Sequence, residues 1–354
     1  MTTLRQYTVI LPKADRTGPC NLAIDLAKGL QGKGYYVRIL YLDKAVDRDD
    51  LKSFPEVRTF KPRDLFKMKG VVHTHCLRPD ILGALLRHLS PGCRVVTTLH
   101  NYFEIDLSFN YPRWLVGVAW WIWSKAIRRI DRRVCISDAM RRYYTRRLAG
   151  VPLDMVYNFC VDKGSYGIMP LENAEFLAWL ETQRAAGRTV LAYVGSVSER
   201  KNILPLTRRV AESAELALVV CGAGPLLGCL NNEIVASGGT SNVIALGHVP
   251  NPHEIVARCD ALILPSRAEG LPLAVIEAAS AGKPALVSNI AVHRELQKLR
   301  IAVTIDHKSF SDLEYKATYA VKDLEVLQIK ANWRRVFSPE QGVKGYSNLF
   351  NRLL

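Results

Sequence analysis

A strand–turn–helix unit in residues 260–295 constrains the fold of this chain more than any other stretch. Four apolar residues, Ala261–Leu264, are followed by a proline, and this short apolar run predicts a buried strand. After a polar turn that contains Glu269, the pattern of Leu271–Ala281 predicts a helix that stops at Gly282. A buried strand that leads so quickly into a helix is typical of an open α/β sheet.

Two glutamates of this unit, Glu269 and Glu277, are eight residues apart. Because eight residues are slightly more than two helical turns, a helix that begins near Pro272 can direct both carboxylates to one cleft. Ligands of open α/β sheets lie at the carboxyl ends of the strands and near helix N-termini. Ionised carboxylates only accept hydrogen bonds, so the pair is suited to sugar hydroxyls. The alternative is a plain strand–helix unit with one solvated glutamate and one near the helix N-terminus.

The positive charge of the chain is concentrated in its first half. Residues 1–160 contain 27 Lys and Arg against 14 Asp and Glu, whereas residues 161–354 contain 21 against 19. A basic half favours an anionic partner. The length of 354 residues and an apolar content of 49% predict two globular domains. Eight scattered cysteines, no visible signal peptide and no long apolar run predict a cytoplasmic protein without a spanning helix.

The region 111–148 combines tryptophan with basic side chains. It holds four of the six tryptophans and ten basic residues, against two aspartates. The apolar stretch Trp114–Trp123 is too short to span a bilayer but is suited to an interface with anionic lipid. The predicted membrane-surface residues are Trp114, Trp120, Trp121, Trp123, Arg128, Arg129, Arg132 and Arg133. A core helix followed by a solvated basic helix is the alternative, and the absence of a nucleic-acid-binding motif predicts no nucleic-acid partner.

Glycines follow predicted strands at places where a phosphate group would bind. Gly18 comes just before a predicted helix, where its backbone can approach an anion at the helix N-terminus. A plain strand–helix turn is an equally good interpretation of one glycine. Gly195 lies in the turn after another predicted strand, Thr189–Val194, and the cations Arg200 and Lys201 that follow are well placed for a diphosphate.

A further pair of glycines, Gly222 and Gly224, mimics a dinucleotide-binding fingerprint together with Gly228. That fingerprint needs an acidic residue at the end of the next strand, and the strand predicted for 242–246 runs into Gly247 instead. The pair therefore indicates a nucleotide loop rather than a nicotinamide site.

Three histidines lie at or near the ends of predicted strands in the first half. His73 and His75 point to the same face if their strand is regular, because the side-chain period of a strand is two. The pair lacks the third ligand that a metal site needs. His100 follows the next strand and faces the cleft, although a structural histidine is the alternative. A possible metal motif, Asp47-x-Asp49, lies in a charged run and predicts a solvated face, so no metal is expected.

These motifs together resemble the retaining GT-B glycosyltransferases, in particular family 4, also called glycosyl transferases group 1. The stretch from Ser266 to Pro284 carries the E-x7-E signature of that family, and T-L-H at His100 resembles its T-x-H. The chain departs from the family at Ser196, where an arginine is common, and at Phe159, where the family usually has glycine.

The resemblance implies an α/β fold of the GT-B type, with two doubly wound Rossmann-like domains facing a cleft. Residues 1–160 would form an acceptor-binding domain and residues 161–336 a nucleotide-sugar-binding domain. Residues 337–354 would form a C-terminal helix that crosses back to the first domain.

The resemblance also implies a retaining, metal-independent transfer of a sugar from a nucleotide diphosphate sugar, most commonly a UDP-sugar, to a hydroxyl. Arg200 and Lys201 would stabilise the departing diphosphate. Glu269 would hold the donor sugar, Glu277 the ribose, and His100 the transferred sugar. Additional donor contacts are expected from Gly18, Gly195, Gly222, Gly224, Gly270, Leu271 and Pro272. No carboxylate is placed as a nucleophile, which favours attack by the acceptor on the face that the diphosphate leaves.

The basic, tryptophan-rich first half adds an expectation about the acceptor. We expect a lipid-linked or lipopolysaccharide-type glycan acceptor, used in cell-surface polysaccharide biosynthesis at the inner face of a bacterial cytoplasmic membrane. Two alternatives remain open from the sequence. One is a UDP-N-acetylhexosamine epimerase of the GT-B fold, and the other is a membrane-peripheral binding protein with a degenerate site.

Overall fold

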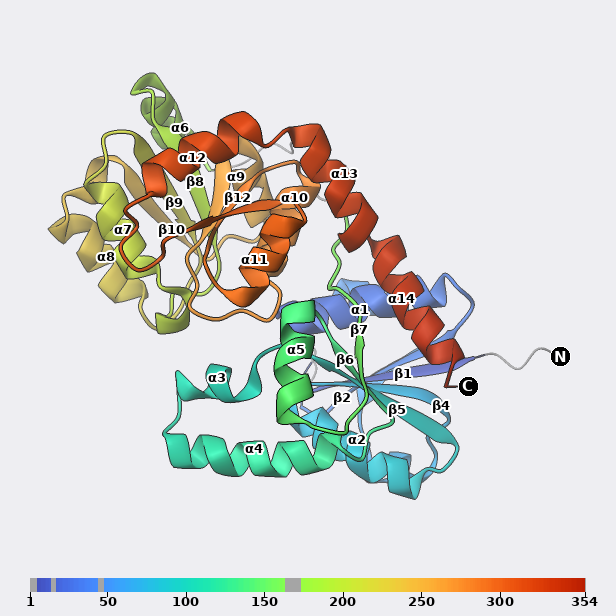
Figure 1. Cartoon of the computed structure of the whole chain (residues 1–354). Coiled ribbons are helices and arrows are strands. Elements are labelled where there is room, and N and C mark those ends of the chain that lie inside the picture. The colour runs from blue at the N-terminus through green and yellow to red at the C-terminus, as the bar shows by residue number, and fades with distance from the viewer. Residues whose placement is uncertain (1–4, 14–16, 44–47, 163–172, 354) are drawn as a thin grey trace. The chain divides into compact units, whose positions relative to one another are not determined.

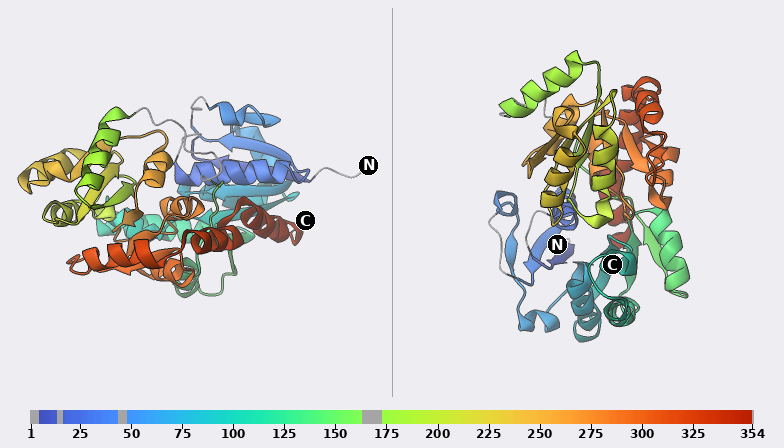
Figure 2. Two further views of the ribbon diagram at one scale, coloured as in Figure 1. Left: turned by 90° about the horizontal axis from the view of Figure 1, so that it is seen from above. Right: turned by 90° about the vertical axis from the view of Figure 1, so that its left-hand side faces the viewer.

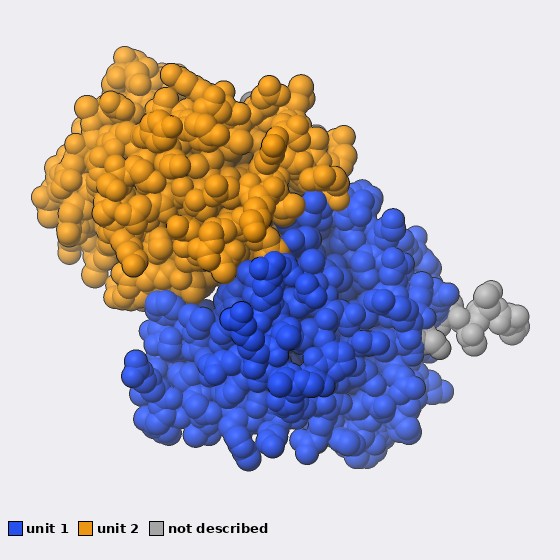
Figure 3. All heavy atoms as spheres, in the orientation of Figure 1, with its two compact units in different colours: residues 1–160, 336–354 blue, residues 161–335 orange. Residues whose placement is uncertain are grey.

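The computed structural model describes residues 5–13, 17–43, 48–162 and 173–353. The chain forms two compact units, each with its own sheet and helices (Figures 1 and 2). Unit 1 comprises residues 1–160 and 336–354, and unit 2 comprises residues 161–335 (Figure 3). Asp47, half of the possible metal motif, lies outside the described residues.

Unit 1 is built on a seven-stranded parallel sheet with the order β3-β2-β1-β4-β5-β6-β7. Its strands are β1 Gln6–Leu11, β2 Tyr36–Tyr41, β3 Glu56–Thr59, β4 Gly70–His75, β5 Cys93–Leu99, β6 Arg132–Cys135 and β7 Leu153–Met155. Its α-helices are α1 Gly18–Gln31, α2 Leu77–Leu89, α3 Phe103–Ser108, α4 Arg113–Ile127, α5 Asp138–Arg147 and α14 Pro339–Asn351. Short 3-10 turns are η1 Asp49–Leu51 and η2 Pro62–Phe66.

Unit 2 is built on a six-stranded parallel sheet with the order β10-β9-β8-β11-β12-β13. Its strands are β8 Thr189–Val194, β9 Leu216–Cys221, β10 Val243–Gly247, β11 Ala261–Leu264, β12 Ala285–Ser288 and β13 Ala302–Ile305. Its helices are α6 Ala174–Ala185, η3 Glu199–Lys201, α7 Ile203–Ala211, α8 Leu227–Ala236, η4 Gly239–Ser241, α9 Pro252–Arg258, α10 Leu273–Ser280, α11 Ala291–Lys298 and α12 Leu313–Asp323. Helix α13, Val326–Phe337, crosses from unit 2 into unit 1.

The predicted α/β fold with two Rossmann-like sheets is confirmed. In each sheet the first strand of the unit lies between the second and the fourth, so the strand order reverses beside β1 in unit 1 and beside β8 in unit 2. At such a reversal, neighbouring connections leave the sheet in opposite directions and open a crevice for ligands. The topology therefore makes the carboxyl ends of β8 and β11 the candidate ligand-binding edge of unit 2.

Continuous apolar runs form the central strands because both faces of a parallel sheet are covered by helices. Every residue of β9 and β11 is buried. The edge strand β3 was not predicted, since its sequence EVRT has a single apolar residue. Helix α1 begins at Gly18 rather than after it, with Pro19 in the first turn, where a missing backbone N–H costs nothing. No disulfide joins these elements, because all eight cysteines are free.

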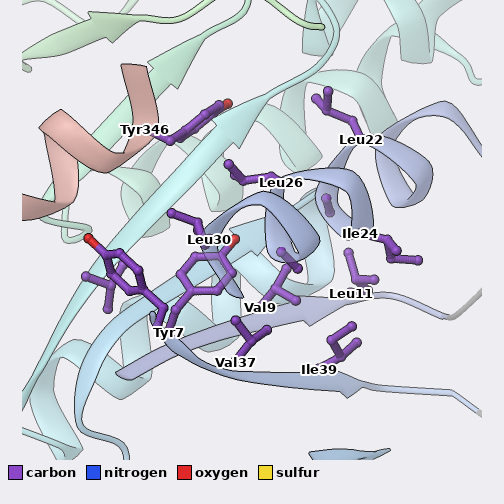
Figure 4. Packing of buried hydrophobic residues seen from close by; sticks show 14 of the residues in the cluster. Tyr7, Val9, Leu11, Leu22, Ile24, Leu26, Leu30, Val37, Ile39 and Tyr346 are labelled. Atoms are coloured by element: carbon purple, nitrogen blue, oxygen red, sulfur yellow. The ribbon is translucent and has the colours of Figure 1, made fainter. Parts of the chain in front are cut away.

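The C-terminal helix α14 completes the core of unit 1, as predicted for a helix that returns to the first domain. Phe350 and Tyr346 are buried in the same cluster as Leu30 of α1 and Val9 of β1. Figure 4 shows Tyr346 from α14 in that cluster with Tyr7 and the leucines of α1. The Phe350 ring lies 5.4 Å from the Tyr7 ring, measured between centroids. Residues more than three hundred positions apart thus share one core.

Replacing Phe350 with alanine is expected to lower the free energy of unfolding of unit 1 by about 3–5 kcal/mol, since it leaves a cavity in this core. Denaturant unfolding followed by tryptophan fluorescence measures the change. Asn348→Ala, an exposed site on the same helix, is the matched control and is expected to change stability by under about 0.5 kcal/mol. Equal effects of the two substitutions would show that α14 is not part of the core.

Candidate active site

Two cations and a carboxylate meet at the strand-order reversal of unit 2. Arg200 and Lys201 lie in η3, which follows β8, and Glu269 lies in the turn after β11. The Lys201 Nζ donates to Glu269 Oε1 at 2.5 Å, and Arg200 Nη1 donates to Glu269 Oε2 at 3.2 Å. Arg200 also donates to the carbonyl oxygen of Ala268, and its own carbonyl accepts from the backbone N–H of Arg267. These bonds join the two loops.

The Glu269 carboxylate is 8% exposed, and its charge is stabilised by the two cations. Burial raises the pKa of the carboxyl, but Lys201 and Arg200 outweigh that effect and lower the pKa from 4.5 to about 2. Glu269 is therefore ionised at neutral pH. Both carboxylate oxygens already accept hydrogen bonds from cations, so a sugar hydroxyl that binds Glu269 would have to share an oxygen with one of these cations. A buried charged group with a displaced pKa at a strand-order reversal makes Glu269 a candidate functional residue.

The glycines of the unit 2 loops are needed for close approach of two backbones. A Cβ on Gly222 would lie 1.8 Å from the carbonyl oxygen of Gly195, and one on Gly224 would lie 2.4 Å from that of Val197. The Val197 N–H donates to the Ala223 carbonyl, which ties the loop after β8 to the loop after β9. The structure thus explains Gly222 and Gly224 by loop packing, and it leaves their predicted nucleotide contacts as a prediction.

The second glutamate of the E-x7-E signature lies near the end of β8. Glu277 is half-buried on α10 and lines a small pocket with Val194, the last residue of β8, and His253 of α9. Gly270, Leu271 and Pro272 form the buried turn that leads into α10. Glu269 and Glu277 are therefore both positioned beside the carboxyl end of β8, by different neighbours.

In unit 1, the three predicted histidines gather at the carboxyl ends of β4 and β5. The His75 Nδ1 and His100 Nε2 atoms are 2.8 Å apart, and the rings of His73 and His75 are 4.3 Å apart between centroids. The prediction that His73 and His75 share a face of the strand is therefore confirmed. His73 contacts Tyr7 and Thr98 through its two ring nitrogens, at 2.9 and 2.8 Å. His100 is the partly exposed member of this cluster.

These histidines are neutral at physiological pH. Burial lowers the pKa of His100 to about 4, and burial together with the charge of His100 lowers the pKa of His73 to about 3. Burial also lowers the pKa of His75. In a neutral His75–His100 pair one ring donates and the other accepts. His75 thereby fixes the orientation of His100 at the end of β5. Gly18, also at this sheet edge, is the first residue of α1 and is half-buried.

The structure exposes some of the predicted membrane-surface residues and buries others. Trp114 and Trp121 are exposed, and Trp120 is half-buried beneath the Arg147 guanidinium, 5.8 Å from the ring centroid. The prediction for Trp123 is wrong, because this side chain is 3% exposed. Its Nε1 donates to the buried Asp80 carboxylate at 2.8 Å, so it anchors helix α4 to α2.

The prediction for Arg133 is wrong for a related reason. Arg133 lies in β6 and is 3% exposed, and its Nε donates to the carbonyl oxygen of Ile127 at 2.6 Å. Its burial lowers the pKa to about 10. Arg128 and Arg129 are exposed, whereas Arg132 is half-buried and lies 3.8 Å from the Asp154 carboxylate.

Sequence reasoning missed His293, which lies on α11 near the Glu269 cluster. It is buried, and its Nδ1 contacts Ser288. Burial lowers the pKa of His293 to about 4, although the charge of Glu269 partly opposes this effect. Its Nε2 has no hydrogen-bond partner among the described residues. The only available signal was its place at the end of the stretch that carries the two glutamates.

Two Rossmann-like units, each with a strand-order reversal, are the architecture of the GT-B fold. The profile of Glycosyl transferases group 1 matches residues 181–327, and that of Glycosyltransferase Family 4 matches residues 18–160. The chain belongs to glycosyltransferase family 4 and is a retaining glycosyltransferase.

Relatives support this assignment along nearly the whole chain. The O-antigen biosynthesis glycosyltransferase WclY of Escherichia coli is 24% identical over 351 residues, which cover 97% of each chain. The Escherichia coli UDP-Gal:alpha-D-GlcNAc-diphosphoundecaprenol alpha-1,3-galactosyltransferase is 27% identical over 290 residues, 79% of this chain and 72% of the relative. The structure of Anabaena Alr3699/HepE in complex with UDP and glucose has a TM-score of 0.77 at 14% identity, with 97% and 99% of the chains covered. That likeness concerns the fold.

The ion pairs of Glu269 are expected to make stability depend on pH in a defined window. A carboxyl whose pKa is lower in the folded state stabilises the fold above its unfolded pKa and loses this effect as the pH falls through the folded pKa. For Glu269 the window runs from about 4.5 down to about 2. The difference in free energy of unfolding between wild type and Glu269→Gln should therefore narrow by roughly 2 kcal/mol between pH 6 and pH 3.

Chemical denaturation at several pH values measures this difference. Glu212→Gln replaces an exposed glutamate of the same unit and serves as the control, with a small and constant difference from wild type. A difference for Glu269→Gln that stays constant with pH would contradict the ion-paired state of Glu269.

Proposed function

We propose that this protein transfers a sugar from a UDP-sugar, with retention of configuration, to a hydroxyl of a lipid-linked or lipopolysaccharide-type glycan. The observation that carries the proposal is the meeting of Arg200, Lys201 and Glu269 at the carboxyl ends of β8 and β11 in a family 4 chain. This is where an open α/β sheet binds its ligand, and the cations match the charge of a diphosphate.

The proposed role of the cations follows from the change in charge during the reaction. When the bond between sugar and diphosphate breaks, negative charge increases on the departing phosphate oxygens. Fixed donors aimed at developing charge supply the largest electrostatic effect in many enzymes. Lys201 and Arg200 are held in place by Glu269 before any donor binds, so little reorganisation is needed. The donor diphosphate would take over part of their hydrogen-bonding capacity.

The remaining site residues take the proposed roles of positioning groups. Glu277 would accept hydrogen bonds from ribose hydroxyls, and Glu269 from a hydroxyl of the donor sugar. His100, neutral and oriented by His75, would contact the transferred sugar. Gly18, Gly195, Gly222, Gly224 and the turn Gly270–Pro272 would place the backbone close to the donor. In this proposal residues 1–160 bind the acceptor and residues 161–336 the nucleotide sugar.

The kind of acceptor is supported by the names of two relatives, and the location follows from that acceptor. WclY is an O-antigen biosynthesis glycosyltransferase, and the galactosyltransferase relative acts on a diphosphoundecaprenol-linked sugar. An acceptor attached to a lipid is presented at a membrane. We therefore place this protein at the inner face of the cytoplasmic membrane, in the biosynthesis of a cell-surface polysaccharide.

Incubation with a panel of UDP-sugars and a synthetic lipid diphosphate sugar acceptor tests the proposal. The expected result is release of UDP together with a new glycosidic bond, whose anomeric configuration in NMR matches that of the donor. Turnover with another nucleotide diphosphate sugar, and with none of the UDP-sugars, would overturn the choice of donor.

Removal of either cation is expected to lower turnover by about 10²–10³-fold, because a donor to the developing negative charge is lost. Lys201→Ala and Arg200→Ala are the variants, and Lys322→Ala, at an exposed lysine of unit 2, is the control. The double variant Lys201→Ala with Glu269→Gln removes both charges of the Lys201–Glu269 ion pair. It leaves neither of these two charges buried without the other, so an effect on turnover can be separated from an effect on folding. Full turnover in this stable double variant would remove Lys201 from the mechanism.

Transfer is expected to persist in excess EDTA, since the two side-chain cations would supply the charge that a metal ion supplies elsewhere. The described part of the chain contains no group of three His, Cys, Asp or Glu that is arranged to hold a metal ion. Initial rates with and without chelator measure the effect. Loss of transfer in EDTA, with recovery on addition of manganese or magnesium, would contradict the metal-independent mechanism.

A further inference from the structure

Helix α4 of unit 1 is apolar on two sides but packed on only one. Its packed side carries Trp123 and Ile127, which are buried. The opposite side exposes Trp114 and Trp121, at 71% and 62% of their surface. A helix that is apolar nearly all round is normally buried, and a contiguous exposed apolar patch marks a binding surface. The packing inside unit 1 therefore leaves one apolar side of α4 uncovered.

The exposed apolar side of α4 continues onto helix α2. The two helices pack against each other and lie side by side in Figure 1 and in the right-hand view of Figure 2. Between them runs a groove of about 710 Å³ whose lining includes Leu85, Trp121 and Ile122. We call the whole patch the α2–α4 surface; its exposed apolar residues are Leu85, Leu89, Trp114, Leu115, Val118, Trp121 and Ile122.

Helices α2 and α4 themselves expose charges of a single, positive sign. Helix α4 contains no Asp or Glu, and the one acidic residue of α2, Asp80, is 1% exposed and bonded to Trp123. The groove is edged by His88, Lys125 and Arg129. Lys125 and Arg129 are exposed, and neither forms an ion pair within the ranges that the structure describes. These two cations are therefore available to an anionic ligand.

We propose that the α2–α4 surface docks on an anionic lipid bilayer. Trp114 and Trp121 lie in the headgroup layer, where the indole ring is favoured, and Lys125 and Arg129 contact lipid phosphates. The described chain has no helix that is long and apolar enough to cross a membrane, so this contact is peripheral. The inference rests on the proposed function in one respect, since a lipid-linked acceptor is what brings the enzyme to a membrane.

A second copy of the chain fits this surface less well. In a two-fold symmetric dimer the same patch meets itself, so Lys125 and Arg129 of both copies would approach each other. The patch exposes no carboxylate that could pair with them. An anionic lipid supplies both the apolar volume and the negative charge. Charge complementarity therefore selects the bilayer over self-association.

Sedimentation with vesicles tests the proposal and needs no catalysis, so its outcome is independent of the donor and acceptor assays. The full-length protein is mixed with phosphatidylcholine vesicles, or with vesicles that also contain phosphatidylglycerol, at low and high salt. Binding is expected only with phosphatidylglycerol and is expected to weaken as salt screens the charges. Equal binding to both vesicle types, or to neither, overturns the proposal.

Substitutions on the α2–α4 surface locate the contact. Lys125→Gln with Arg129→Gln is expected to reduce partitioning onto anionic vesicles by about thirtyfold, roughly fivefold for each cation. Trp114→Ser with Trp121→Ser is expected to reduce pelleting to background without a change in circular dichroism, since both side chains are exposed. Matched controls at exposed sites of unit 2, Lys298→Gln with Lys322→Gln and Tyr315→Ser with Leu327→Ser, are expected to bind like wild type.

Light scattering of the same samples distinguishes the other occupant. The proposal expects the same mass in solution for wild type and for the Trp114→Ser, Trp121→Ser variant. A dimer that this variant abolishes, together with no binding to anionic vesicles, would assign the α2–α4 surface to a second copy and overturn the bilayer contact. Vesicle binding that survives both double substitutions would place the membrane contact elsewhere on the protein.

Discussion

The parallel direction of every strand is the constraint on which the two candidate sites depend. Because the strands of each sheet run in the same direction, their carboxyl ends all lie at one edge of the sheet. In unit 2 this edge brings the loop after β8 to the turn after β11, although about seventy residues separate them. In unit 1 the same rule places His75 at the end of β4 beside His100 after β5. Neither cluster exists as a local sequence motif.

The two clusters meet the cost of burying ionisable groups in opposite ways. Glu269 stays charged because Lys201 and Arg200 supply two opposite charges within hydrogen-bond distance. A buried ion pair of this kind contributes little net stability, because desolvation offsets much of the attraction. What the ion pairs with Glu269 do is hold both cations in a fixed orientation before a ligand binds. The histidines of unit 1 stay neutral instead, and neutral rings can orient one another by hydrogen bonds.

Tryptophan has two different functions within one helix of unit 1. Trp123 fixes α4 to α2 through its hydrogen bond to Asp80, and it packs α4 on α3 through its ring, which is stacked on Phe103. Trp121, two residues earlier, points to the other side because successive helical residues are about 100° apart. One side therefore builds the core of the unit while the other forms the α2–α4 surface. One tryptophan-rich helix can thus pack in the core on one side and present an exposed apolar surface on the other.

The sequence by itself determined the α/β class, most strand positions, the family and the two glutamates eight residues apart. These features follow from local patterns, since apolar runs, glycines and spacing act within a few residues of the chain. The tertiary structure alone decided that Glu269 is bonded to Lys201 and Arg200, that His293 lies near them, and that Trp123 and Arg133 are buried. Periodicity could not settle those points, because which side of a helix or strand is covered depends on elements distant in the sequence.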